Sequence, residues 1–243
     1  MRAITFDMDG VLVDAMPFHY EAMKIAIKEI TNIDLDKRTF YLLEGMPVAE
    51  MALEIFKLKG YVVVDDDSDE NIAKKDIEKT AAKVAQRKKE IFRKMDVTPK
   101  PFDGIRELII YDLSNCLKAV VSGAAKQEVD TIIEDIFGKD KFDIIINGDD
   151  FEGKGKPDPG PFKVALQRLN INKPSDALVV ENAPFGVKAA NNAGIPCIVT
   201  LNTSPLTISD FKDLISSEDS IFKDTKSASK FLKKWCNNEI SDR

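Results

Sequence analysis

The sequence predicts an α/β protein in which a doubly wound parallel sheet is interrupted by an inserted all-helical domain. Beyond residue 100, short apolar segments alternate with amphipathic segments of helical period. This alternation is typical of repeated β–α–β units, which build parallel sheets. Another short apolar segment stands at the N-terminus, and residues 17–95 show helical periodicity without strand alternation. The helical region is therefore expected to be an insertion.

The N-terminal segment, residues 3–6, is predicted to be a buried strand. The next helix is expected to begin near Pro17, because proline suits the first turn, and apolar residues then recur at helical spacing: Tyr20, Met23, Ile27 and Ile30. A helix around residues 51–56 is ended by Gly60. The acidic run 65–70 is interpreted as a solvated turn, and a long polar helix is predicted over 71–95, before a break at 98–101.

Four more strands are predicted, over residues 117–121, 143–146, 177–180 and 197–200. Helices are predicted between and after them, over residues 126–137, 161–169 and 186–193. A single strand cannot fold alone, so the N-terminal strand is assigned to the same sheet. We therefore expect a Rossmann-like core domain of residues 1–15 and 99–243, with a helical domain of residues 16–98 inserted into it.

The composition predicts a soluble globular protein without a nucleic-acid or membrane partner. The 243 residues carry a net charge of −6, with 44% hydrophobic and 31% charged residues, and no apolar run has the length of a membrane span. The N-terminus is not expected to be a signal peptide, because one arginine precedes a charged motif. Three scattered cysteines favour a reducing, cytoplasmic setting. We expect a monomer.

Unusual polar residues stand where four predicted strands end or in the loop that follows. Parallel strands bring their carboxyl ends to one edge of the sheet, so these side chains are expected to meet. They are Asp7 and Asp9, Ser122 and Gly123, Lys156, and Glu181 and Asn182. Together they offer a nucleophile, an anion cradle, a fixed positive charge and oxygen ligands for a metal. This combination suits phosphoryl transfer.

Taken singly, each of these features has a plainer explanation. An isolated Asp-x-Asp pair such as Asp7 and Asp9 often occurs by chance. Ser122-Gly123 alone resembles a turn with an N-cap, and Lys156 alone is a loop lysine. Their joint occurrence, in this order, favours the functional interpretation. Because the chain has one histidine, a zinc site with several histidines is excluded, and oxygen ligands point to Mg²⁺.

Four segments of the sequence resemble the motifs of the haloacid dehalogenase (HAD) superfamily of phosphohydrolases. They read FDMDGVLVD, VVSG, GKPDPGPF and VVENAPFGVKAANNAG. The chain is most similar to the subgroup that includes β-phosphoglucomutase and phosphoglycolate phosphatase, in which a helical cap follows the first motif. The resemblance covers nearly the whole chain and implies a phosphatase that acts on a small phosphorylated metabolite such as a sugar phosphate.

The resemblance also implies a role for each motif. Asp7 would attack phosphorus to form an aspartyl-phosphate, and Asp9 would act as general acid and base. Ser122 and Gly123 would hold the phosphoryl oxygens, and Lys156 would neutralise charge. Mg²⁺ would be bound by Asp7, Asp9, Glu181 and Asn182. Relatives usually carry an aspartate where this chain has Asn182, so one ligand is neutral and the affinity for Mg²⁺ is expected to be weaker.

Substrate contacts are expected from the cap. His19 stands early in the first cap helix, near the substrate in similar proteins, against the alternative of a structural histidine. Gly45 belongs to the loop that covers the substrate, and Lys88 lies in the basic run 87–89, against the alternative of a solvated helix face. Val48 stands where β-phosphoglucomutase has an arginine for a second phosphate. Its presence favours hydrolysis.

Other activities remain open at this point. The first alternative is an isomerase similar to β-phosphoglucomutase. A dehalogenase would not need Asp9, and a phosphonate hydrolase would need a cap lysine, for which Lys57 and Lys59 are candidates by position. The alternative from another class is a non-catalytic binding module with the same fold, which only Asn182 favours.

Overall fold

A computed structural model describes residues 1–61, 70–95, 98–151 and 155–240. Its centre is a six-stranded parallel sheet with the strand order β3-β2-β1-β4-β5-β6. The strands are β1 (Ala3–Phe6), β2 (Leu117–Val121), β3 (Ile144–Ile146), β4 (Ala177–Glu181), β5 (Cys197–Thr200) and β6 (Ile221–Phe222). This is the order of a doubly wound sheet, in which the first strand lies centrally. The predicted fold class is confirmed.

Alternation along the strands explains why helices cover both faces of the sheet. In β1, Ile4 and Phe6 pack into one cluster of buried apolar residues, whereas Ala3 packs into a cluster on the opposite face. The same two-residue period separates Val120 from Val121 in β2. Both faces are therefore apolar, and each requires a covering layer.

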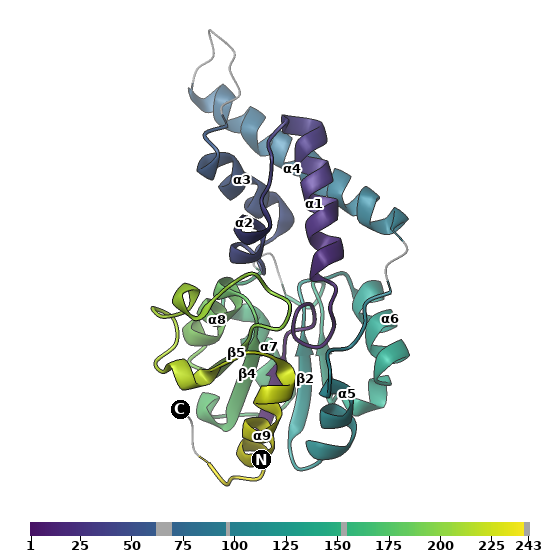
Figure 1. Cartoon of the computed structure of the whole chain (residues 1–243), viewed down its shortest axis with the longest axis vertical. Coiled ribbons are helices and arrows are strands. Elements are labelled where there is room, and N and C mark those ends of the chain that lie inside the picture. Colours follow the sequence, from purple (N-terminus) through teal and green to yellow (C-terminus); the bar gives the residue numbers. More distant parts are fainter. Residues whose placement is uncertain (62–69, 96–97, 152–154, 241–243) are drawn as a thin grey trace.

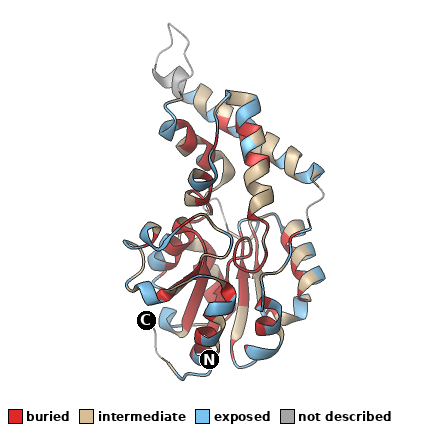
Figure 2. Ribbon diagram, viewed as in Figure 1, coloured by how far each residue is buried: buried red, intermediate tan, exposed pale blue. Residues whose placement is uncertain are grey.

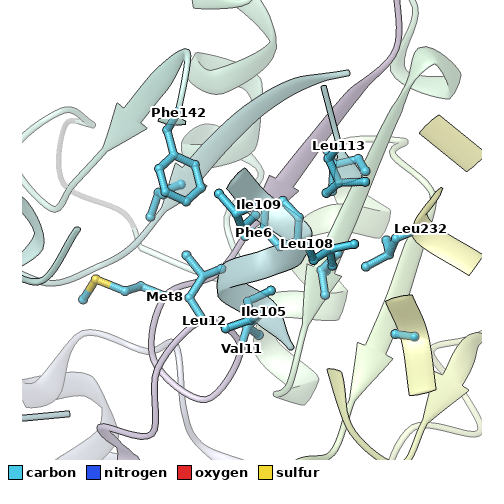
Figure 3. Packing of buried hydrophobic residues seen from close by; sticks show 14 of the residues in the cluster. Phe6, Met8, Val11, Leu12, Ile105, Leu108, Ile109, Leu113, Phe142 and Leu232 are labelled. Carbon is cyan, nitrogen blue, oxygen red and sulfur yellow. The ribbon is translucent and has the colours of Figure 1, made fainter. Parts of the chain in front are cut away.

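The helices of the core form those two layers (Figure 1), and Figure 3 shows side chains of the cluster on one of the two faces. On one face lie α7 (Gly160–Arg168) and α8 (Pro184–Asn192), with Phe162, Ala165 and Ala189 in their cluster. On the other face lie α5 (Ile105–Glu107), the π-helical turn η1 (Leu108–Asp112), α6 (Lys126–Ile136) and α9 (Thr225–Cys236). Trp235 of α9 is fully buried there.

Helices α1 (Met16–Thr31), α2 (Lys37–Leu42), α3 (Val48–Leu58) and α4 (Glu70–Lys94) form the cap. They stand over one end of the sheet (Figure 1), with α4 packed against α1 and α3. Their buried residues continue into core residues such as Val187 and Phe211, and Figure 2 shows buried positions in both parts. The cap is therefore seated on the core through an apolar contact.

The predicted elements agree with the structure to within a few residues, and the shortest elements were missed. Gly60, with φ +64°, directly follows the last turn of α3 as expected. Residues 65–69 of the acidic run lie outside the described residues. The six residues of α2 and the two of β6 are too short for a periodic pattern. The remaining turns are η2 (Lys139–Lys141), η3 (Pro174–Asp176), η4 (Ile208–Asp210) and η5 (Glu218–Ser220).

Across the described parts of the chain, no helix has both the length and the apolar character that crossing a membrane requires.

Candidate active site

The candidate site lies where the central strands end, beneath the cap. Asp7 follows β1 directly, Ser122 follows β2, and Glu181 is the last residue of β4. Because β1 pairs with both β2 and β4, their carboxyl ends meet at the point where the strand order reverses, the usual ligand position in such sheets. A cavity of about 380 Å³ lies there between core and cap.

The structure brings almost all of the predicted site residues to this cavity. Its lining includes the following residues from the sequence-based prediction: Asp7, Asp9, His19, Gly45, Lys88, Ser122, Gly123, Lys156 and Glu181. Asn182 is the exception, since it lies just outside the lining and is 1% exposed. The motifs that are far apart in the sequence therefore form one site.

Lys156 joins two buried carboxylates at the floor of the cavity. Its Nζ donates to Asp7 Oδ1 at 2.5 Å and to Glu181 Oε1 at 2.6 Å, and it lies 3.4 Å from the carbonyl oxygen of Val121. The Lys156 side chain is only 6% exposed. The buried ammonium group compensates one of the two negative charges, so the ionised triad carries a net charge of −1.

Burial dominates the electrostatics of Asp7. It raises the pKa of the Asp7 carboxyl from 3.8 to about 7, although the charge of Lys156 lowers that pKa and the charges of Glu181 and Asp9 raise it. Burial alone would lower the pKa of the Lys156 ammonium, but Asp7 and Glu181 outweigh it and raise this pKa. The positive charge of Lys156 is thus fixed beside Asp7. Burial disfavours the anionic form of the Asp7 carboxyl, and the Lys156 charge favours it.

The turn after β1 places Asp9 at the cavity and needs a glycine behind it. Gly10 has φ +87°, and a Cβ there would lie 2.1 Å from Asn182 Nδ2. The Gly10 N–H donates to the carbonyl oxygen of Val13 at 2.8 Å, which closes the turn. Only glycine permits this close approach and this backbone conformation.

Ser122 and Gly123 form a second tight turn on the opposite side of Asp7. The Ser122 N–H donates to the carbonyl oxygen of Ile146 at 3.0 Å, and Ser122 Oγ accepts from the Ala124 N–H at 3.1 Å. A Cβ on Gly123 would meet nothing within 4 Å. Open space therefore lies beside this turn, at the position predicted for the phosphoryl oxygens.

Asn182 contacts the cap. Its Nδ2 donates to Glu44 Oε2 at 2.9 Å, and Glu44 stands in the loop between α2 and α3, 9% exposed. Burial raises the pKa of Glu44 well above its usual value; nearby Asp7 also raises it, whereas the hydrogen bond from Asn182 lowers it. The amide of Asn182 thus joins a buried cap carboxyl to the edge of the sheet.

The donor set suits a hard cation such as Mg²⁺ in its chemistry. Asp9 Oδ1 and Asn182 Oδ1 are buried oxygen atoms without a hydrogen-bond partner in the described residues, and such oxygens prefer Mg²⁺. Within those residues, no three His, Cys, Asp or Glu side chains are arranged as a metal site. Both carboxylate oxygens of Glu181 already accept hydrogen bonds, Oε1 from Lys156 at 2.6 Å and Oε2 from the Asn182 N–H at 3.1 Å. Asp7, Asp9 and Asn182 are the residues that would hold the ion.

Two cap residues stand over Asp9. The His19 ring stacks on Phe92, with centroids 4.2 Å apart, and Lys88 Nζ lies 2.9 Å from His19 Nδ1. An ammonium group can only donate, so His19 Nδ1 accepts and Nε2 carries the proton. His19 Nε2 is 3.5 Å from Asp9 Oδ2 and 3.7 Å from Glu128 Oε1. His19 and Lys88 are thus coupled to Asp9.

The other cap residues considered from the sequence fall into two groups, those that line the cavity and those that lie outside it. Val48 lines the cavity, while Arg87 pairs with Glu29 at 2.6 Å outside it. Gly45, with φ +92°, lies so close to the core that a Cβ would contact Lys156 at 3.4 Å. Neither Lys57 nor Lys59 lines the cavity, and they pair instead with Glu54 and Asp36. The two lysines considered for a phosphonate hydrolase therefore lie outside the site.

Two acidic residues at the site escaped functional assignment from sequence. Glu44 stands directly before Gly45, and an acid before a glycine in a largely apolar stretch is a signal. Glu128 stands in the first turn of α6, where an acid is normally explained by the helix dipole. Burial raises the pKa of Glu128, and nothing in the local sequence predicts that burial.

Together, the fold and the cavity define a protein of the capped α/β type, with a buried carboxylate at the switch point of the sheet. The chain belongs to the family of haloacid dehalogenase-like hydrolases, whose model matches residues 4–200.

The chain is also similar to individual proteins in sequence and in fold. A phosphorylated carbohydrates phosphatase of Thermotoga maritima is 32% identical over 202 residues, covering 80% of this chain and 82% of the relative. Fructose-1-phosphate phosphatase of Escherichia coli is 24% identical over 200 residues, covering 80% and 94%. The structure of β-phosphoglucomutase from Clostridium difficile has a TM-score of 0.69 at 21% identity over 98% of both chains, a likeness of fold alone.

These similarities confirm two predictions made from the motifs. The chain is a HAD-like hydrolase with a helical cap, of the subgroup that includes β-phosphoglucomutase. It is an enzyme of the phosphoric monoester hydrolase type.

Proposed function

We propose that this chain is a Mg²⁺-dependent phosphatase that hydrolyses a small phosphorylated metabolite, with sugar phosphates as the first candidates, through an aspartyl-phosphate. The observation that carries the proposal is the buried Asp7 carboxylate, held by Lys156 at 2.5 Å on the floor of a covered cavity. The names of two relatives, which are phosphatases of phosphorylated carbohydrates and of fructose 1-phosphate, support this substrate class.

Asp7 and Asp9 take different roles in the proposed reaction. A carboxylate oxygen of Asp7 attacks phosphorus, and the bond from phosphorus to the leaving oxygen breaks as Asp9 gives that oxygen a proton. Water then attacks the aspartyl-phosphate, Asp9 accepts the proton from water, and inorganic phosphate leaves. The contact of Asp9 with His19 on the cap supports a link between proton transfer and cap closure.

Lys156, Ser122 and Gly123 hold the phosphoryl group in this proposal. The ammonium of Lys156 reduces the repulsion between Asp7 and an incoming phosphate. Ser122 and Gly123 line the cavity beside Asp7, and the Ser122 hydroxyl and the Gly123 N–H would bind the phosphoryl oxygens. Bound Mg²⁺ would supply further neutralisation of these anions. Covering by the cap keeps bulk water from the intermediate.

Hydrolysis is favoured over isomerisation by the residue at position 48. A mutase must grip a bisphosphate at both ends, and Val48 at the cap end of the cavity offers no charge for this. Arg87, which could replace the missing arginine, is paired with Glu29 outside the cavity. A phosphoryl group on Asp7 is therefore expected to pass to water.

Phosphate release from a panel of phosphorylated metabolites tests this proposal. We expect release from at least one sugar monophosphate with Mg²⁺ present, and loss of that release in excess chelator. Glucose 1-phosphate belongs to the panel, because its isomerisation with little free phosphate would establish the mutase instead. Full activity in chelator would refute the role of Mg²⁺, and no turnover of any member would favour a non-catalytic module.

A further inference from the structure

The cavity is polar at its core end, and most of the side chains that the cap adds to its lining are apolar. Asp7, Ser122 and Lys156 lie at the core end, where the phosphoryl group is expected. The cap contributes seven apolar side chains to the lining: Met16, Met23, Phe40, Met46, Pro47, Val48 and Met51. A leaving alcohol that extends from the phosphoryl group toward the cap would therefore contact hydrocarbon and thioether groups.

The charged groups of the cap that line the cavity already have partners. Lys88 Nζ lies 2.9 Å from His19 Nδ1, and Glu44 accepts from Asn182 at 2.9 Å. In the described part of the chain, Lys88 is the only lysine or arginine that the cap adds to the lining, and burial lowers its pKa. A second phosphate or a carboxylate would thus be buried beside Glu44 with one cation to compensate it, which is unfavourable.

Hydroxyl groups face a similar penalty at the cap end. A hydroxyl that leaves water without gaining a partner loses binding energy, and the seven apolar side chains offer no strong donors or acceptors. Four of those seven residues are methionines, whose flexible thioethers adapt to differently shaped apolar surfaces. This lining therefore selects for apolar surface and tolerates variation in its shape.

We propose that the substrate is a monophosphate ester of a compact alcohol that presents an apolar face and carries no second anionic group. This inference rests on the proposed phosphatase function and narrows its substrate class. The cavity of about 380 Å³ is near the lower end of ligand sites, which span roughly 300–1,000 Å³. It suits a single small ring, such as a deoxygenated sugar or a cyclic alcohol.

Binding to the Asp7→Asn variant tests the inference without turnover. Cyclohexylmethyl phosphate and glucose 6-phosphate are both phosphates of a primary alcohol on a six-membered ring, and they differ in ring oxygen and hydroxyls. Calorimetry should show about tenfold tighter binding of cyclohexylmethyl phosphate, and fructose 1,6-bisphosphate should bind more weakly than either. Equal affinities, a reversed order, or no binding of either monophosphate overturns the inference.

A pair of variants locates the selectivity. Met46→Gln places an amide in the cavity lining and should reduce the preference for cyclohexylmethyl phosphate several-fold. Met95→Gln is the matched control, because Met95 lies at the end of α4 outside the lining, and it should leave the preference unchanged. A preference that is the same in both variants contradicts the assignment of selectivity to this lining.

Turnover by the unaltered protein separates this inference from the proposed function. Phosphate release with cyclohexylmethyl phosphate preferred supports both. Release with glucose 6-phosphate preferred retains the phosphatase and overturns the substrate class. No release from any compound, with the binding preference retained, overturns the phosphatase and retains the selectivity of the cavity.

Discussion

At the scale of single residues, Lys156 determines whether the site can exist. It holds Asp7 and Glu181 within 2.6 Å in an environment where none of the three is more than 11% exposed. Without the ammonium, two carboxylates would be left buried and uncompensated. The same lysine that neutralises the phosphoryl group in the proposed reaction is therefore also a stabilising element of the core.

We expect Lys156→Met to destabilise the protein by about 3–5 kcal/mol at pH 8, because one partner of a buried ionic group is removed. The raised pKa of Asp7, about 7 with Lys156 present, rises further without it. A carboxyl with a raised pKa contributes stability at low pH that is lost as the pH rises through that pKa. The deficit should therefore shrink when urea denaturation is repeated at pH 5.

Lys139→Met is the control for this experiment. Lys139 pairs with Asp130 at 3.5 Å on the surface, with a half-exposed side chain, and its loss should change stability by less than about 1 kcal/mol. A deficit for Lys156→Met that matches this control, or that is the same at both pH values, would refute the proposed charge compensation.

At the scale of elements, the beginning of α2 depends on one capping residue. Asp36 Oδ1 accepts from the Thr39 N–H at 2.8 Å, and Oδ2 accepts from Lys59 Nζ at 3.2 Å. The hydrogen bond from the Thr39 N–H is the main reason that the pKa of Asp36 is lowered to about 2. This N-cap residue stabilises the start of α2, the helix that precedes the loop with Glu44 and Gly45.

Asp36→Ala should destabilise the protein by about 1 kcal/mol at pH 7, the usual value of an N-cap. Because the pKa is depressed below 3.8, the contribution is present above that pH and is lost as the pH falls toward 2. Urea denaturation at pH 7 and near pH 3 should show the difference decreasing. Asp34→Ala, at an exposed position that caps no helix, should stay within about 0.5 kcal/mol of the unaltered protein. An equal loss of stability in the two variants would contradict the role of Asp36 as the N-cap of α2.

Some strands and helices could be predicted from the sequence alone, and others could not. The β2 and β5 strands were predicted to the residue because their apolar runs end in polar residues. The strand ends then predicted that Asp7, Ser122 and Glu181 meet at one edge of the sheet, since parallel strands bring their carboxyl ends together. Missed elements such as α2 and β6 are too short for periodicity to be detected.

At the scale of the whole molecule, the site is completed by the seating of the cap on the core. Contacts from Glu44 to Asn182 and from His19 to Asp9 and Glu128 join segments that are far apart in the sequence. No local pattern predicts them, because they depend on how two separately folded layers pack. The cap residues were accordingly the part of the site that sequence analysis described least.

Gly45 offers a test of that seating. Both Gly45 and Gly60 have positive φ, but a Cβ on Gly45 would contact Lys156 at 3.4 Å, whereas one on Gly60 would meet nothing within 4 Å. Replacing either by alanine should cost about 1 kcal/mol of stability because of the backbone conformation. Only Gly45→Ala should also reduce kcat/KM for phosphate release, by about tenfold. Equal kcat/KM for the two variants would show that the cap loop does not position the site.

The most direct test of the proposed mechanism is phosphate release by Asp7→Asn in the presence of Mg²⁺. The substitution keeps the shape of the side chain and removes the attacking carboxylate, so kcat should fall by roughly a thousandfold or more. Asp14→Asn is the matched control, because Asp14 lies outside the cavity lining and contacts Thr203, and it should retain activity. Turnover by Asp7→Asn at a rate close to that of Asp14→Asn would contradict the aspartyl-phosphate mechanism.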